Sequence, residues 1–339
     1  SALPEARAYV AVESSGEGLT FLGGLRARGL GSDRVRLIET GQPLTAWARD
    51  PTLPVIGLDG GVTLWSAPES SLALERSGDY RFAARLAEHS RGAFIIQRSD
   101  LMAEGGNVLS TGRRVLIGAN SARHNLSLPD DVPSVEHLTQ RLEDVFGLPV
   151  AMVGDGTNAP HEHLDMYVTL LDDRRALVAD SSAGSAILQG AGSDVLAGWE
   201  AMFASDSSAV YSGRPFSLAD RLERGRDAGL ALALTRVARH LERLGFDVIR
   251  VPAVLAGING GYPILTYNNV LLEQRDGQQR VLMPVYGLAP LDSAAADAWS
   301  ALGYVVHSID VSNILDLEGA VRCLTQVLRR GPRPDVTTP

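Results

Sequence analysis

The sequence contains no lysine, because all 31 of its Lys and Arg residues are arginines. A chain without lysine cannot form a lysine Schiff base, cannot place a Walker lysine on a phosphate and has no lysine general base. These absences exclude several common classes of enzyme before any motif is considered. Catalysis by this chain would have to use other side chains.

Cysteine occurs only once, at Cys323. A single cysteine excludes an intrachain disulfide, a CxxC redox pair and a metal site built from several thiolates. The usual structural role of a lone cysteine is that of a small buried hydrophobe.

Long hydrophobic runs are also missing. The longest, such as residues 230–234, fall far short of the roughly 18 residues that a bilayer-spanning helix needs. The first residues show no basic segment followed by an apolar one, which is the pattern of a secretory signal. We expect no membrane partner and, by default, a cytoplasmic location.

The 339 residues are 45% hydrophobic, 21% charged and 6% aromatic, which is typical of an ordinary globular protein. A chain of this length can bury roughly 75% of its unfolded surface, so its stability requires no staple or metal. The formal net charge is −9. An acidic chain is a poor partner for nucleic acid or an anionic membrane, and its charge favours a cationic ligand.

One pattern recurs along the chain: an amphipathic helix, then a glycine, then a short β-branched run. The clearest copies have the glycine at Gly147, Gly245 and Gly303, and weaker copies cover residues 21–38 and 82–96. Apolar spacings of three and four that end at a glycine are typical of a helix whose left-handed C′ residue leads into a strand. The expected strand centres are near residues 37, 95, 151, 249 and 306.

These centres are about 57 residues apart, except for one interval that is about 40 residues longer. We place the corresponding insertion near residues 181–216, which are rich in Ser, Gly and Ala. Five similar α/β units favour a closed, circular array over an open one. An ordinary α/β protein in which the pattern recurs by chance is the alternative. No linker or charge block separates the units, so we expect one domain over residues 1–330 and a loose tail over 331–339.

Segments with reactive side chains follow four of the five expected strands, about 8 to 17 residues downstream. If the units surround a common axis, these segments converge on one end of it. The remaining unit leads to residues 266–269, which carry no charged group. The four reactive segments are Trp47-Ala48-Arg49-Asp50, Glu104-Gly105-Gly106-Asn107, His161-Glu162-His163-Leu164-Asp165 and Gly319-Ala320-Val321-Arg322-Cys323.

The stretch around His163 and Asp165 has the apolar alternation of a strand, which predicts that both side chains leave the same face. A histidine and a carboxylate on one face can act together as proton carrier and cation anchor. The alternative is a half-exposed strand with its polar residues outward. His161 and His163 also match a zinc-chelating pair, but HExxH spacing and a nearby third ligand of certain identity are both missing. We therefore expect no metal.

Two other segments are ambiguous when taken singly. Glu104 and Asn107 flank a glycine pair, which suits a tight turn or a close approach of backbone to a ligand but does not fit a GxGxxG nucleotide loop. An ordinary turn is the alternative there. Asp50 follows Trp47 and Arg49, and a surface Arg-Asp pair is the alternative at that position.

Taken together and in order, the four segments resemble the guanidine-modifying (pentein) superfamily, which includes agmatine deiminases, peptidylarginine deiminases, arginine deiminases and amidinotransferases. The motifs are W-x-R-D, E-G-G-N, H-x-D and a late G-A-x-x-C followed by Thr, and they span residues 47–325. The resemblance implies a five-bladed α/β propeller of pseudo-repeats. That fold agrees with the five units expected from the repeat.

The resemblance also implies a role for each matching residue. Cys323 becomes the nucleophile and His163 the general acid and base, while Asp50 and Asp165 bind the guanidinium group. Glu104 is similar to a glutamate that lies beside the histidine and also touches substrate. The implied reaction passes through a covalent thiouronium and uses no metal or organic cofactor. The other residues expected to bind substrate are Trp47, Arg49 and Asn107.

Two departures from the family pattern bear on the substrate. Agmatine deiminases commonly carry a histidine just before the cysteine, where this chain has Arg322, and residues 51–54 replace a Thr-Gly-Pro. Both changes lie where the non-guanidine part of a substrate would bind, which weakens agmatine as the specific substrate. The expected ligand is a cationic guanidino small molecule or an arginine-containing peptide, with peptidyl or substituted arginine ahead of agmatine. A homodimer is one of the expected assemblies.

Several alternatives stay open. An amidinotransferase would pass the amidino group to an amine instead of water, and a guanidino dihydrolase would release two ammonia molecules. A non-catalytic protein that binds guanidino ligands belongs to a different class, although the joint presence of all the core site residues argues against it. A metal hydrolase acting through His161 and His163 is the fourth alternative.

Overall fold

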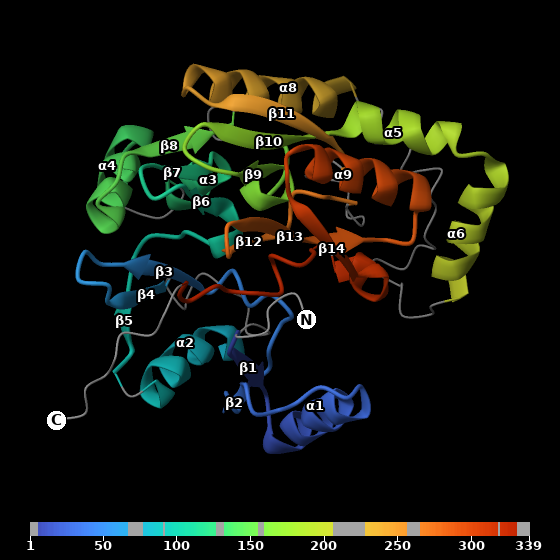
Figure 1. Cartoon of the computed structure of the whole chain (residues 1–339). Helices are drawn as coiled ribbons and strands as arrows, with labels where there is room; N and C mark the ends of the chain where they lie inside the picture. The colour runs from blue at the N-terminus through green and yellow to red at the C-terminus, as the bar shows by residue number, and fades with distance from the viewer. Residues whose placement is uncertain are drawn as a thin grey trace. The chain divides into compact units, whose positions relative to one another are not determined.

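The structure is a computed structural model that describes residues 6–66, 77–90, 92–126, 132–154, 159–205, 228–255, 265–317 and 319–330 (Figure 1). Helices and strands alternate along these residues, so the predicted α/β class is confirmed. The chain divides into two compact units. The first contains Leu3–Gly105 and the segment from Thr325 onward, and the second contains Gly106–Leu324.

The first unit begins with a two-stranded sheet. β1 (Ala8–Val12) pairs in parallel with β2 (Val35–Glu39), and α1 (Ser15–Ala27) connects them. Ser14 caps this helix, because its side chain accepts the N–H of Glu17 at 3.3 Å.

The second sheet of this unit has three strands. β3 (Thr52–Ile56) is antiparallel to β4 (Val62–Ser66), and β4 is parallel to β5 (Phe94–Arg98). A parallel pair needs a crossover, and α2 (Ser77–His89) lies within it. Apolar side chains from both sheets, from α2 and from the C-terminal segment pack together. These are Val62, Leu64, Leu86, Tyr9, Phe82, Phe94 and Leu328.

The second unit repeats this connectivity three times. In its first sheet, β6 (Val108–Ser110) is antiparallel to β7 (Val115–Gly118), and β7 is parallel to β8 (Val150–Val153). The crossover contains α3 (Asn120–Leu126) and α4 (Val135–Phe146).

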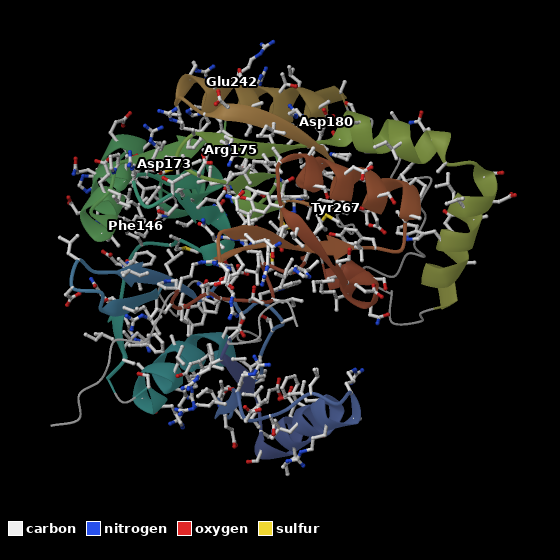
Figure 2. All side chains as sticks on the ribbon, viewed as in Figure 1. Phe146, Asp173, Arg175, Asp180, Glu242 and Tyr267 are labelled. Atoms are coloured by element: carbon white, nitrogen blue, oxygen red, sulfur yellow. The ribbon has the colours of Figure 1, made fainter. Side chains whose placement is uncertain are left out.

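The next sheet has the same order, with β9 (Val168–Leu170) antiparallel to β10 (Arg175–Asp180) and β10 parallel to β11 (Asp247–Pro252). Asp180, which Figure 2 labels, ends β10. It caps the following helix, because its Oδ1 accepts the N–H of Ala183 at 2.9 Å. The crossover contains α5 (Ser181–Gly190), α6 (Ser193–Ser205) and α8 (Ala228–Arg243). Helix α8 packs on β10 and β11 (Figure 1).

In the last sheet, β12 (Leu271–Arg275) is antiparallel to β13 (Gln278–Val285), and β13 is parallel to β14 (Val305–Asp310). The crossover helix is α9 (Ala289–Ala301). The described residues thus form five small sheets of one kind, the first of them short of one strand.

The predicted helix–glycine–strand pattern is confirmed in its three clearest copies. Gly147, Gly245 and Gly303 follow α4, α8 and α9 with φ of 62°, 91° and 86°, the left-handed region that glycine adopts without strain. The five expected strand centres fall within β2, β5, β8, β11 and β14, the last strand of each sheet.

The predicted insertion near residues 181–216 coincides in part with α5 and α6. Its remainder from residue 206, and the expected loose tail over 331–339, lie outside the described residues. Over the ranges that are described, no helix is both long and apolar enough to cross a bilayer.

Candidate active site

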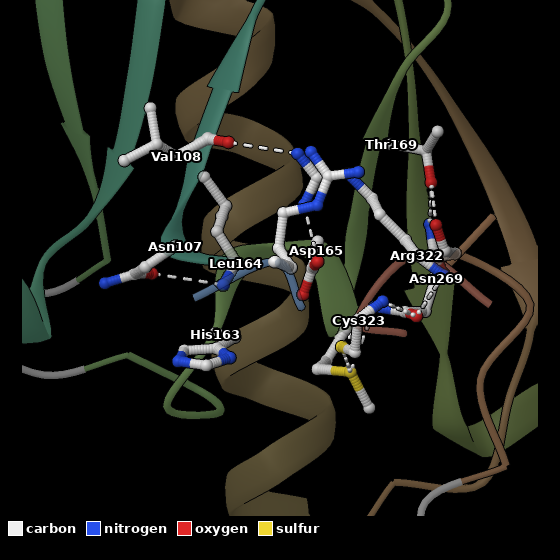
Figure 3. Close-up of polar contacts among 12 residues, drawn as sticks. Asn107, Val108, His163, Leu164, Asp165, Thr169, Asn269, Arg322 and Cys323 are labelled. Atoms are coloured by element: carbon white, nitrogen blue, oxygen red, sulfur yellow. Dashed lines mark hydrogen bonds and ion pairs between the residues drawn. The ribbon is translucent and has the colours of Figure 1, made fainter. Parts of the chain in front are cut away.

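Cys323 lies in a turn that follows the 3₁₀ segment Ser312–Leu317. Its side chain is only 3% exposed. The sulfur accepts a hydrogen bond from Asn269 Nδ2 at 3.0 Å and lies 4.0 Å from Met166 Sδ (Figure 3). A donor at this distance can stabilise the negative charge of a thiolate.

Asn269 holds both the backbone and the sulfur of this turn. Its Oδ1 accepts the main-chain N–H groups of Arg322 at 2.9 Å and of Cys323 at 3.1 Å. Asn269 is fully buried, and a hydrogen bond of 2.7 Å from Thr169 Oγ1 to the carbonyl of Asn268 fixes the residue before it (Figure 3). The amide therefore sets the position of the thiol from two directions.

Asp165 is fully buried and forms an ion pair with the chain's own arginine. Its Oδ2 lies 2.5 Å from Nη1 of Arg322, whose side chain is 15% exposed. Arg322 Nη2 also donates to the carbonyl of Val108 at 3.2 Å (Figure 3). The second carboxylate oxygen, Oδ1, is buried and has no hydrogen-bond partner among the residues that the structure describes.

The prediction that the H-x-D motif lies in a strand is wrong for the motif itself. Residues Leu164–Met166 form a single 3₁₀ turn with His163 as its N-cap, and β9 begins only at Val168. Two residues of such a turn point in different directions, so the expected common face does not exist. The turn persists because Asn107 Oδ1 accepts the Leu164 N–H at 3.1 Å and the carbonyl of Met166 accepts the Thr266 hydroxyl at 2.6 Å.

His163 is half-buried, and its main-chain N–H donates to Nδ1 of His161 at 3.2 Å. Burial lowers the pKa of His161 to about 4, and the neighbouring His163 lowers it further in the same direction. His161 is therefore neutral at pH 7. In the described part of the chain, no three His, Cys, Asp or Glu side chains lie close enough to hold a metal ion.

Glu162 lies between the two histidines in the sequence, and its carboxylate contacts two side chains of α3. Its Oε1 lies 3.0 Å from His124 Nε2 and its Oε2 lies 3.3 Å from Arg123 Nη2. The hydrogen bond from His124 is the main cause that lowers the pKa of Glu162 to about 2. This carboxylate stays charged at neutral pH and ties the loop to α3.

Asn107 is buried, and its side-chain amide forms hydrogen bonds with other groups of the protein. Nδ2 donates to Asn120 Oδ1 at 3.0 Å and to Ser121 Oγ at 2.7 Å, while Oδ1 accepts the Leu164 N–H. These contacts position the 3₁₀ turn that carries Asp165. The predicted contact of Asn107 with substrate stays a prediction.

The W-x-R-D motif meets the first two residues of the E-G-G-N motif within the first unit. The N–H of Gly105 donates to the carbonyl of Asp50 at 3.3 Å, and a Cβ on Gly105 would lie only 2.0 Å from the carbonyl oxygen of Arg49. Only glycine allows this approach, which gives the motif's first glycine a structural reason. Asp50 and Arg49 are buried, whereas Trp47 and Glu104 are half-buried.

The predicted site residues thus fall into two groups. Cys323, Asp165 and His163 belong to the second unit together with Asn107. Asp50 and the other first-unit residues named above form the second group, and their predicted roles remain predictions.

Three residues of the thiol's surroundings were not predicted as site residues: Asn269, Met166 and Arg322. Asn269 lies in the segment 266–269, which follows one of the five expected strands and has no charged group. A search for ionisable side chains therefore does not find it. Arg322 stands at the position where the chain departs from the family pattern, which is a signal that its side chain has a particular role. Met166 resembles any other core residue in the sequence.

No protein-family model matches this sequence, and no curated protein is similar to it in sequence.

Solved structures match the fold over nearly the whole chain. A protein provisionally assigned as a peptidyl-arginine deiminase is 15% identical with a TM-score of 0.64, covering 97% of this chain and 87% of that one. The agmatine deiminase of Enterococcus faecalis is 17% identical with a TM-score of 0.60, covering 94% and 82%. A serine-for-cysteine variant of the C. jejuni agmatine deiminase, solved with substrate bound, is 14% identical with a TM-score of 0.60, covering 96% and 84%. The fold of this chain is therefore similar to that of these deiminases, as the predicted resemblance implies.

Proposed function

We propose that this protein is a cysteine-dependent hydrolase that converts a guanidino group to a ureido group and releases ammonia. One observation carries the proposal: the buried carboxylate of Asp165 holds a guanidinium group, that of Arg322, in the residue next to the only thiol of the chain. The fold likeness to agmatine deiminases, one of them solved with its substrate, supports a guanidino compound as the ligand.

The chemistry of the guanidinium group explains why it needs these side chains. It is planar, permanently charged and a poor electrophile, so it must be held by carboxylates and attacked by a strong, polarisable nucleophile. A buried carboxylate offers the first requirement and a cysteine thiolate the second. The cationic substrate would itself favour the thiolate form of Cys323.

In the proposed reaction, the Cys323 thiolate forms a bond to the guanidinium carbon. His163 gives a proton to one terminal nitrogen, the carbon–nitrogen bond breaks, and ammonia leaves a covalent thiouronium on the sulfur. Water then gives a proton to His163 and adds to the same carbon. The carbon–sulfur bond breaks and the added hydroxyl gives its proton to solvent, which releases the neutral ureido product and restores the thiolate.

We propose further that the five sheets are the five blades of a propeller. Four sheets of one connectivity, a fifth sheet with the same parallel pair, and the likeness to the solved deiminase folds support this arrangement. Asp50 is the proposed second carboxylate for the guanidinium group, and Glu104 is proposed to act together with the general acid and base, as the resemblance implies. Trp47 and Arg49 would contact the rest of the substrate.

The test is an assay of the purified protein with arginine, agmatine, arginine-containing peptides and guanidino acids, with and without glycine as an amidino acceptor. Ammonia, ureido product and transferred amidino group are measured separately. We expect equal amounts of ammonia and ureido product from one class of substrate, and none from a Cys323→Ala variant. Amidino transfer to glycine would show a transferase instead. Turnover that survives in Cys323→Ala would contradict the proposed nucleophile.

A further inference from the structure

Arg322 places a guanidinium group of the chain itself on the carboxylate that we propose to bind the substrate. The Nη1–Oδ2 distance to Asp165 is 2.5 Å, and the carboxylate is fully buried. Nη2 reaches the carbonyl of Val108 at 3.2 Å (Figure 3). The free protein therefore keeps its buried negative charge paired, which avoids the large cost of an isolated buried carboxylate.

Arg322 binds only one of the two carboxylate oxygens of Asp165. Oδ1 of Asp165 is buried and has no hydrogen-bond partner in the described ranges, while Oδ2 has Arg322. A guanidinium group can donate two parallel hydrogen bonds to both oxygens of one carboxylate. A substrate that binds Asp165 in this manner gains one charge-assisted hydrogen bond that Arg322 does not make.

Displacement of Arg322 requires no change of backbone. Its main-chain N–H is fixed by Asn269 Oδ1 at 2.9 Å, and the N–H of Cys323 is held by the same atom at 3.1 Å. The long side chain rotates about several bonds and already reaches solvent, since 15% of it is exposed. The thiol can thus stay in place while the guanidinium group leaves Asp165.

We propose that Arg322 is a specificity-determining residue that occupies the Asp165 site until a substrate guanidinium displaces it. This inference rests on the proposed function. An ammonium ion lacks the planar fork that matches both oxygens of a carboxylate with two parallel hydrogen bonds, so it gains less over Arg322 than a guanidinium does. A forked guanidinium gains one bond and displaces it. The competition lowers the apparent affinity for every ligand, but it excludes amines more strongly than guanidines.

The experiment measures binding of methylguanidinium and methylammonium to the wild type, Arg322→Ala and Arg322→Lys by calorimetry and by the shift in unfolding temperature. We expect methylguanidinium to bind both variants about tenfold or more tightly than the wild type, because its competitor is gone or weaker. Methylammonium should bind Arg322→Ala measurably and the wild type hardly at all. Arg322→Lys keeps a positive charge beside Asp165, so it tests the proposal even if Arg322→Ala does not fold.

Arg113→Ala is the matched control, because it removes an arginine from an exposed pair with Asp173, 2.9 Å long, in the same unit. Its affinity for both probes should equal that of the wild type. Equal or weaker binding of methylguanidinium in both Arg322 variants would overturn the inference, and wild-type turnover would then leave the proposed function intact. If methylguanidinium binds the variants more tightly but the wild type turns over no guanidino compound, the proposed function is wrong and the occupation of Asp165 by Arg322 still holds.

Discussion

The amide of Asn269 offers a quantitative test of how the thiol is held. Asn269→Ala removes the donor 3.0 Å from the sulfur and the acceptor of the Cys323 N–H. The Arg322 N–H keeps a second acceptor, the main-chain carbonyl of residue 269 at 3.3 Å. The stability cost is therefore that of one buried N–H without its acceptor, about 1–3 kcal/mol in the free energy of unfolding.

The effect on reactivity follows from the lost bond to sulfur. A hydrogen bond to a charged group contributes about 1.5–3 kcal/mol, so its loss lowers the thiolate population about 10- to 100-fold where the thiol dominates. The thiolate that remains in the variant is more basic and therefore a better nucleophile. With a Brønsted coefficient of about 0.5, this gain offsets half of the loss in thiolate population when both are expressed as logarithms of the rate. We expect alkylation of Cys323 by iodoacetamide to slow by about 3- to 10-fold in Asn269→Ala.

The assay follows iodoacetamide modification at fixed pH, with urea unfolding of the same samples. Asn125→Ala serves as the matched control, since Asn125 is also buried but donates to the carbonyl of Ser121 at 2.8 Å instead of the sulfur. That variant should lose stability and keep the wild-type alkylation rate. An unchanged rate in Asn269→Ala, or an equal slowing in both variants, would refute the reasoning.

Two further outcomes are expected. Asp165→Asn should abolish both binding and turnover of guanidino substrates, because it removes the buried charge of the site; a mild rise in KM with unchanged kcat would show that Asp165 does not touch the substrate. His161→Asn keeps an acceptor for the His163 N–H but removes a histidine whose pKa in the fold is about 4 against an ordinary 6.5. Because the unfolded chain binds a proton below pH 6.5 and the folded one does not, the wild type should lose about 2–3 kcal/mol of unfolding free energy from this group between pH 6.5 and 4. Urea unfolding across this range should show a flatter pH dependence in the variant, and an equal slope in both proteins would contradict the assignment.

The repeat was predictable because its signals are local. A helix stripe, a glycine such as Gly147 and a β-branched run lie within about a dozen residues of one another, and the left-handed φ of that glycine ends the helix wherever it occurs. The same signals located the last strand of every sheet.

The H-x-D motif was misread because its local pattern and its tertiary contacts disagree. Leu164, Met166 and Val168 alternate as in a strand, but Asn107 and Thr266 bind the main chain of the motif and close a 3₁₀ turn. These partners lie 57 and 100 residues away in the sequence. Alternation alone cannot reveal such contacts.

The thiol's surroundings could be predicted only in part. The family resemblance names Cys323 and Asp165 as site residues, and their roles stay predictions; the pairing of Asp165 with Arg322 joins residues 157 positions apart, which no sequence pattern reveals. Asn269 is a neutral amide, and no charge or spacing distinguishes it from other buried asparagines. Its role becomes visible only when the turn and the segment before β12 are seen together (Figure 3).

The most direct test of the proposed mechanism is mass spectrometry of the Cys323 peptide after rapid acid quenching of the enzyme during turnover. We expect Cys323 of the wild type to carry the mass of the substrate less ammonia, and little of this adduct to form in a His163→Gln variant, because the departing nitrogen then lacks its proton donor. Steady formation of ureido product by the wild type while its Cys323 peptide stays unmodified would contradict covalent catalysis by this thiol.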